Sequence, residues 1–259
     1  MDHEVEYDDA MVKILELIWG EGFMAPGSTE LVDKLVSGLR IQGKRVLDIG
    51  SGLGGSACYL AETYGALVTG IDIEPQLVEL SNRKSKQSGL ADTTEFILVE
   101  PGPLPFSEES FDIVLSAGAF TQIPDKSSMF TECLRVLTPG GKMHSFDWTT
   151  PNGVISDDLR YFFEVEDLSY ALETPGTFER LLKTAGFTEV TASDDSEWYR
   201  RQSREEYELI KGTLYAQMVE LLGSKDADHF VENWRAMAIV FEKGDLTQTI
   251  CRSSKPERQ

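Results

Sequence analysis

The stretch that most constrains the fold is VLDIGSGLGG at 46–55, where a short apolar run ends in a cluster of glycines. Gly50, Gly52 and Gly55 have the G-x-G-x-x-G spacing, directly after a predicted strand. Glycines at this point let the backbone approach a bound nucleotide at the carboxyl edge of a parallel sheet. Asp72 ends the next predicted strand, where its carboxylate can accept both ribose hydroxyls. Strand, glycines and acid together predict a nucleotide site.

Predicted strands and helices alternate through most of the chain. Apolar runs predict seven strands, at 45–49, 66–71, 94–99, 111–116, 142–147, 189–192 and 246–251. Helical periodicity predicts helices at 9–19, 28–39, 55–64, 75–88, 126–137, 175–185, 203–222 and 225–241. The prediction is an α/β fold with a doubly wound, Rossmann-like, mostly parallel seven-stranded sheet.

Three segments flank or interrupt this sheet. Residues 1–42 are expected to form an N-terminal helical lid, and the main domain is expected over 43–252. Residues 152–187 follow the fifth strand and predict a helical insertion that covers the substrate. The tail SSKPERQ at 253–259 is predicted to be disordered.

Charge and composition exclude several classes of partner. A formal net charge of −20 repels phosphate backbones and anionic lipid headgroups, so we expect no nucleic-acid or membrane partner. No apolar run approaches the length of a membrane span, and the acidic start MDHEVEYDD is unlike a targeting peptide. Three cysteines without C-x-x-C spacing argue for a reducing cytoplasm, and three scattered histidines predict no metal site. The oligomeric state stays open between monomer and homodimer.

Three strings resemble class I S-adenosylmethionine-dependent methyltransferases: VLDIGSGLGG at 46–55, LPFSEESFDIVLS at 104–116 and CLRVLTPGGKM at 133–143. The resemblance implies S-adenosylmethionine as cofactor. Its methionine end is expected near Asp48 and Gly50, its ribose on Asp72 and its adenine amine near Glu100. The resemblance adds further cofactor contacts, namely Gly52, Ile73, Pro101 and Ala117. The alternative for Asp48 is a structural carboxylate that caps the glycine turn.

Pro101 departs from the family pattern. The family offers a backbone N–H to adenine at this position, and proline has none. Either adenine recognition is weaker, or Gly102 supplies the donor, or the loop varies without functional effect.

The flanking segments narrow the resemblance to phosphoethanolamine methyltransferases, and more loosely to sarcosine and dimethylglycine N-methyltransferases. It is carried by YDDAMVKILELIWGEGFMAPGS at 7–28, FERLLKTAGFTEV at 178–190 and VENWRAMAIVFEKGD at 231–245. The catalytic residues of that family are replaced. Its Ser-Arg-Asp-x-x-x-His motif begins Ser-Ala-Gly here, with Gln122 at the histidine position, and its partner tyrosine falls at Leu15. Its phosphate-binding arginine and lysine fall at Leu168 and about Met237.

These replacements argue for a different acceptor. A dianionic phosphate needs cations, whereas the insertion offers Glu164, Glu166 and Asp167. In methyl transfer, alignment and desolvation supply most of the rate, and a neutral amine attacks without a base. Gln122 is the catalytic candidate, because its amide can orient such a substrate.

Further residues are expected to line the substrate site with Gln122, namely Trp19, Phe23, Asp147, Trp148 and Tyr170. The rings can favour a cation by π contact, and Asp147 ends the fifth predicted strand. Each of these assignments has an alternative. The rings can be ordinary packing, and the Gln122 amide can be bonded to backbone. The acids Glu164, Glu166 and Asp167 can form a solvated helix face.

The predicted function is S-adenosylmethionine-dependent N-methylation of a small non-phosphorylated amine without a dedicated general base. One alternative is an S- or O-methyltransferase of small-molecule or natural-product metabolism, thioether substrates included. Another is a non-catalytic S-adenosylmethionine-binding regulator, which the missing catalytic pair favours.

Overall fold

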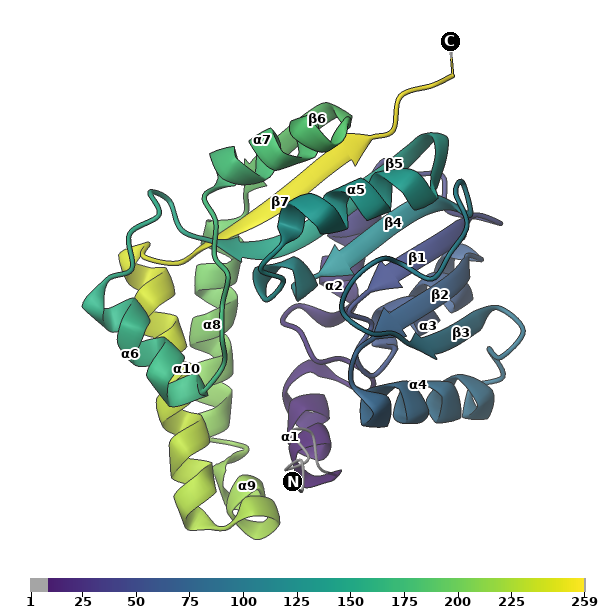
Figure 1. The fold of residues 1–259 in the computed structure, drawn as a ribbon. Coiled ribbons are helices and arrows are strands. Elements are labelled where there is room, and N and C mark those ends of the chain that lie inside the picture. Colours follow the sequence, from purple (N-terminus) through teal and green to yellow (C-terminus); the bar gives the residue numbers. More distant parts are fainter. Residues whose placement is uncertain (1–8, 259) are drawn as a thin grey trace.

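A single seven-stranded sheet organises the computed structural model, which describes residues 9–258 (Figure 1). The strand order is β3-β2-β1-β4-β5-β7-β6. Strands β1 to β5 pair in parallel with one another, and β7 runs antiparallel to both β5 and β6. The strands are β1 (Arg45–Ile49), β2 (Leu67–Asp72), β3 (Thr94–Leu98), β4 (Phe111–Ala117), β5 (Leu137–Thr149), β6 (Thr188–Asp194) and β7 (Thr247–Ser254). The predicted sheet is confirmed, while Tyr7, where the flanking resemblance begins, lies outside the described residues.

Helices cover both faces of this sheet because its central strands are apolar on both faces. Val46 and Leu47 of β1 are fully buried, although their side chains point to opposite faces. Val46 packs in one core cluster and Leu47 in another. The first cluster includes residues of α2 (Ser28–Val36), α3 (Gly55–Tyr64) and α4 (Pro75–Gln87), and the second includes residues of α5 (Lys126–Val136) and α7 (Pro175–Ala185).

A further group of helices, called the helical arm here, extends from the carboxyl side of the sheet (Figure 1). It consists of α6 (Asp157–Glu166), α8 (Ser196–Lys211), α9 (Tyr215–Leu222) and α10 (Ser224–Lys243). The predicted insertion thus contains α6, which begins where the Ser156 hydroxyl accepts the Leu159 N–H at 3.1 Å. Helix α1 (Asp9–Trp19) joins the arm in one apolar cluster through Ile14 and Leu15.

Two predicted boundaries on the C-terminal side are wrong. One helix was expected over 203–222, but Gly212 (φ −108°, ψ −92°) leaves the helical conformation and separates α8 from α9. The tail was expected to be disordered from residue 253, but β7 runs to Ser254 and the Lys255 N–H donates to the Gly141 carbonyl at 2.8 Å. Pairing with β5 satisfies this backbone, which the sequence pattern alone does not reveal.

Within residues 9–258, no helix is long and apolar enough to cross a membrane. The same residues contain no group of three or more histidine, cysteine or acidic side chains close enough together to hold a metal ion.

Candidate cofactor and acceptor site

The glycine turn after β1 leaves the carboxyl edge of the sheet open. Gly50 and Gly52 have positive φ values of 72° and 52°, which favour glycine. Gly50 is exposed, and a Cβ added there would lie 2.4 Å from the Cβ of Ala119. The N–H groups of Gly50 and Ser51 both donate to the Ile71 carbonyl, at 2.9 and 3.0 Å. The turn is therefore anchored to β2 and leaves no room for a side chain at Gly50.

Asp72 organises this turn from the end of β2. One carboxylate oxygen accepts the Gly52 N–H at 2.8 Å, and the other accepts the Glu74 N–H at 3.1 Å. Each oxygen has a second lone pair, so further donors can bind. Ile73 beside it is 54% exposed, an apolar surface suited to a ring such as adenine.

Asp48 lies beneath the same turn, 3% exposed, and one of its carboxylate oxygens has no hydrogen-bond partner among the described residues. Burial raises the pKa of this carboxyl to about 7, and the neighbouring Asp72 carboxylate adds to the rise. An unsatisfied buried carboxylate is costly unless a donor or cation completes it. The buried Asp48 carboxylate therefore fits a ligand that brings positive charge to the turn.

The other predicted cofactor residues lie along the same edge. Asp72 is in register with Leu98 of β3, so Glu100 and Pro101 lie just beyond the edge, and both are exposed. Ala117 ends β4, the neighbour of β1 on the other side. No described atom lies within 4 Å of the position that a Gly102 Cβ would take, so the loop after β3 is open there.

Residues 20–27, called the strap here, pack on the glycine turn. The Gly55 N–H at the start of α3 donates to the Gly22 carbonyl at 2.8 Å. The Met24 sulfur would lie 3.0 Å from a Cβ on Gly52, and the Phe23 ring would lie 3.1 Å from one on Gly55. The strap thus covers the turn where a nucleotide is expected.

The contact between Gly55 and Gly22 gives a prediction about strap closure. Gly55 does not have positive φ, so alanine is allowed there, but its Cβ would lie 2.4 Å from the Gly22 carbonyl oxygen. We expect Gly55→Ala to push the strap off the turn without destabilising α3, because alanine is a better helix former than glycine. Limited proteolysis should cleave the strap several-fold faster than in wild type, with an unchanged or higher melting temperature. Equal cleavage rates would show that this contact does not hold the strap.

The predicted acceptor site is tied together by Thr121, in the turn after β4. Its N–H donates to the Asp147 carboxylate at 3.2 Å, and its hydroxyl accepts the Trp148 N–H at 3.1 Å. Its carbonyl accepts the Ala171 N–H at 2.9 Å, which brings in the segment after α6. Thr121 carries no motif, so the sequence did not single it out.

Gln122 follows at the end of the 3₁₀ helix Ala119–Thr121 and is exposed. Its side-chain amide makes no hydrogen bond to any residue within 9–258, whereas its backbone N–H donates to the Ala119 carbonyl at 3.1 Å. The alternative of a backbone-bonded amide is therefore not seen, and the amide is available to a ligand.

Asp147 is 1% exposed at the carboxyl end of β5. Burial raises the pKa of this carboxyl to about 6, against the opposing effects of Ser145, Lys126 and Thr121. One of its oxygens has no partner among the described residues. Asp147 and Asp48 thus both place an unsatisfied acceptor near this edge.

Trp148 and Tyr170 lie together, with ring centroids 5.6 Å apart. The Tyr170 hydroxyl donates to Glu166 at 2.5 Å, and burial raises the pKa of that carboxyl to about 7. Glu166 is partly buried, so a fully solvated acidic face is wrong for this residue, although Glu164 and Asp167 are exposed as that alternative expected.

Trp19 and Phe23 do not join this group in the predicted way. The Trp19 indole N–H donates to Glu206 of α8 at 2.8 Å, and its ring lies 5.7 Å from that of Trp234. Phe23 lies on the glycine turn through Gly55. The hypothesis that these rings wall the acceptor site together with Trp148 finds no contact in the structure.

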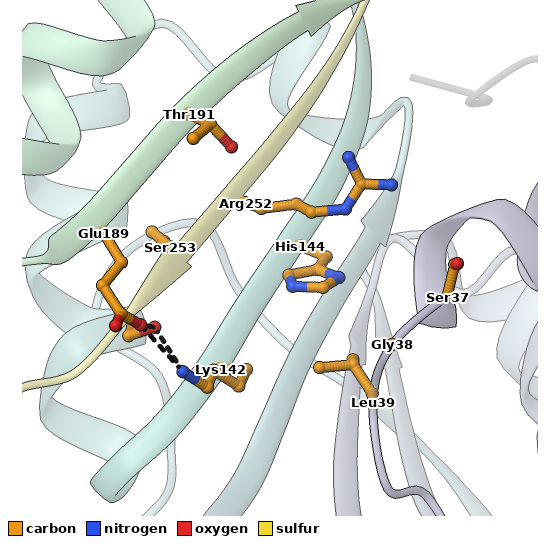
Figure 2. Close-up of a pocket in the computed structure, with 10 residues that line it drawn as sticks. Ser37, Gly38, Leu39, Lys142, His144, Glu189, Thr191, Arg252 and Ser253 are labelled. Carbon is orange, nitrogen blue, oxygen red and sulfur yellow. Dashed lines mark hydrogen bonds and ion pairs between the residues drawn. The ribbon is translucent and has the colours of Figure 1, made fainter.

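Two surface grooves of about 320 and 310 Å³ lie elsewhere, where β5 begins and β7 ends. Arg252 and His144 both line the first groove (Figure 2). Arg252 donates to the Lys34 carbonyl at 3.1 Å, and His144 Nδ1 lies 2.5 Å from the Leu35 carbonyl oxygen. These bonds cap the end of α2, which explains why that helix stops at Val36 rather than near residue 39. Burial lowers the pKa of His144 to about 4, which favours the neutral imidazole at this position. Neither groove contains a predicted site residue.

Comparisons with known proteins identify methyltransferases among the relatives of this chain. A family model described as a methyltransferase domain matches residues 47–144. Phosphoethanolamine N-methyltransferase 1 of Triticum aestivum is 28% identical over 233 residues, which are 90% of this chain and 46% of that protein. This chain therefore spans about half the length of the plant relative. The phosphoethanolamine N-methyltransferase of Plasmodium falciparum is 30% identical over 210 residues, 79% of this chain and 77% of that protein.

A solved structure shows the same fold. It is that of Haemonchus contortus phosphoethanolamine N-methyltransferase 2, in complex with phosphomonomethylethanolamine and S-adenosylhomocysteine. It matches with a TM-score of 0.89 at 22% identity and covers 98% of this chain and 59% of that one.

Proposed function

Because this chain belongs to the class I S-adenosylmethionine-dependent methyltransferases, we propose that it transfers a methyl group to the nitrogen of a small amine that carries no phosphate. The proposed binding site for the methyl donor rests on one observation: the buried Asp48 carboxylate beneath the open glycine turn has an oxygen without a hydrogen-bond partner among the described residues. S-adenosylmethionine supplies an electrophilic methyl group on a sulfonium and also carries an ammonium. Asp48 offers negative charge to that cationic end, while Asp72 and Ile73 offer hydrogen bonds and apolar contact to the ribose and adenine.

The chain needs no general base for an amine acceptor. A neutral amine presents a lone pair, so the residues around it have to align the nitrogen and exclude water. Gln122 has an uncommitted amide that can orient the acceptor, and Asp147 has an unsatisfied oxygen that can accept an N–H. In this proposal both residues position the nitrogen, and neither abstracts a proton in the transfer step.

The proposal that the acceptor carries no phosphate depends on the residues found at the positions where the family resemblance expects phosphate-binding side chains. Met237 is 5% exposed, and its sulfur accepts the Tyr199 hydroxyl at 3.7 Å. Glu166, the last residue of α6, brings a carboxyl group that accepts the Tyr170 hydroxyl. An apolar thioether and an acid disfavour a dianionic phosphate and suit a neutral or cationic substrate.

A product-release assay tests this function. Wild-type protein should release S-adenosylhomocysteine with small amines and methylated amines, and phosphoethanolamine should support at least tenfold less turnover, about 1.4 kcal/mol of discrimination or more. Thiols, thioethers and phenols complete the acceptor series, because transfer to sulfur or oxygen alone would replace the amine proposal. Robust methylation of phosphoethanolamine would contradict the acceptor class. Gln122→Ala should lower turnover with an unchanged affinity for the donor.

A further inference from the structure

Glu206 is a buried carboxylate that no motif of the family predicts. It lies on α8, is 2% exposed and has no lysine or arginine partner within residues 9–258. Three N–H groups point at it: the Trp19 indole at 2.8 Å, the Trp234 indole at 3.1 Å and the Gln202 amide at 3.2 Å. In the sequence it stands in SREEYE, which reads as an ordinary solvated helix.

The Trp19 bond crosses from the helical arm to the N-terminal helix. Trp19 is the last residue of α1, and the strap begins directly after it. The Ser28 hydroxyl, at the other end of the strap, donates to the Trp19 carbonyl. Both ends of the strap therefore meet at the residue that Glu206 holds.

On its other side, the strap is fixed to the sheet domain. Glu16 of α1 accepts the Gly22 N–H at 2.8 Å and pairs with Lys84 of α4. The Gly22 carbonyl in turn accepts the Gly55 N–H of the glycine turn. The strap thus lies between two anchors, one on the helical arm and one on the nucleotide side.

We propose that Glu206 is a positioning residue that acts through the Trp19 indole N–H to hold the strap closed over the bound cofactor. The inference rests on the proposed function, since it concerns the closure of that cofactor site. A buried carboxylate needs its donors, so the Trp19 bond fixes the end of α1 more firmly than ring packing alone. Closure then adds strap contacts to a bound cofactor and slows its release.

The chain supplies a matched pair of variants. Trp19→Phe and Trp234→Phe each remove one indole donor to Glu206 and keep an aromatic ring, so the packing of the two rings on each other is retained in both. Only Trp19 adjoins the strap. We expect Trp19→Phe to weaken S-adenosylmethionine binding about tenfold in calorimetry, the loss of about one hydrogen bond to a charged group. Trp234→Phe should stay within about twofold of wild type, because its donor joins α8 to α10 alone. Equal losses in the two variants, or no loss in Trp19→Phe, would overturn the role of Glu206.

A second variant covers the case in which Trp19→Phe does not fold. Glu206→Gln keeps the size of the side chain but sets an N–H₂ group against an indole N–H. We expect weaker cofactor binding at an unchanged melting temperature, because loss of the buried charge offsets the hydrogen bond that the amide does not make. Affinity and stability falling together would mean a purely structural role and would overturn the inference. If wild type itself does not bind the cofactor, the proposed function fails first, which separates the two outcomes.

Discussion

Replacing Asp72 with alanine is expected to weaken S-adenosylmethionine binding by about 100-fold. The carboxylate holds the glycine turn through the Gly52 N–H and is proposed to accept the ribose hydroxyls as well. Hydrogen bonds to a charged group contribute roughly 1.5–3 kcal/mol each, and about 1.4 kcal/mol changes affinity tenfold. Loss of two such bonds at the lower end of that range gives the expected factor, which calorimetry measures directly.

Two controls sharpen this result. Asp92→Ala removes an exposed acid from the loop before β3 and should leave the affinity unchanged. Asp72→Asn keeps an oxygen acceptor and should lie between wild type and Asp72→Ala. Unchanged affinity in Asp72→Ala would refute the ribose role.

Cofactor affinity is also expected to depend strongly on pH. The pKa of Asp48 is raised from 3.8 to about 7, first by burial and then by Asp72. A cationic ligand favours the ionised carboxylate, so below that pKa binding has to release a proton. Affinity should therefore fall toward about tenfold per pH unit as the pH is lowered below about 7.

The raised pKa of Asp48 also determines how the stability of the cofactor-free protein changes with pH. Between 3.8 and about 7 the folded protein binds the Asp48 proton more tightly than the unfolded chain does. The Asp48 contribution to the free energy of unfolding therefore falls as the pH rises through that window. Asp48→Asn should bind the cofactor more weakly at about pH 8 and lose most of the pH dependence. A wild-type affinity that is constant from about pH 8 to about pH 6 would contradict the contact between Asp48 and the cationic end.

The sheet and the cofactor edge were predictable because local patterns encode them. The run at 46–49 is apolar on both faces, and the glycines after it require positive φ at Gly50 and Gly52. Asp72 lies where a strand ends, and parallel strands bring their carboxyl ends to one edge, so spacing alone places it beside Gly52.

The acceptor side was less predictable because it depends on contacts between distant segments. Thr121 joins Asp147, Trp148 and Ala171 through its backbone and hydroxyl, and nothing in its neighbours signals this. Trp19 was expected to face the substrate, yet its indole N–H is satisfied by Glu206, which is far away in the sequence. Periodicity reports which face of a helix is apolar, but not which distant carboxylate a given ring will meet.

The proposed change of acceptor concerns residues that the resemblance aligns with the family's catalytic and phosphate-binding positions. Leu15 is buried in the cluster that joins α1 to the helical arm, and Met237 is buried beside Tyr199. Both side chains are buried in one apolar cluster and offer no cation to a phosphate. Glu166, bonded to Tyr170, places a carboxyl group rather than a cation in the insertion.

Titration of the wild-type protein with S-adenosylmethionine in a calorimeter tests the central claim most directly. We expect binding of one cofactor per chain and competition by S-adenosylhomocysteine for the same site. Absence of binding up to hundreds of micromolar would contradict both a methyltransferase and a cofactor-binding regulator.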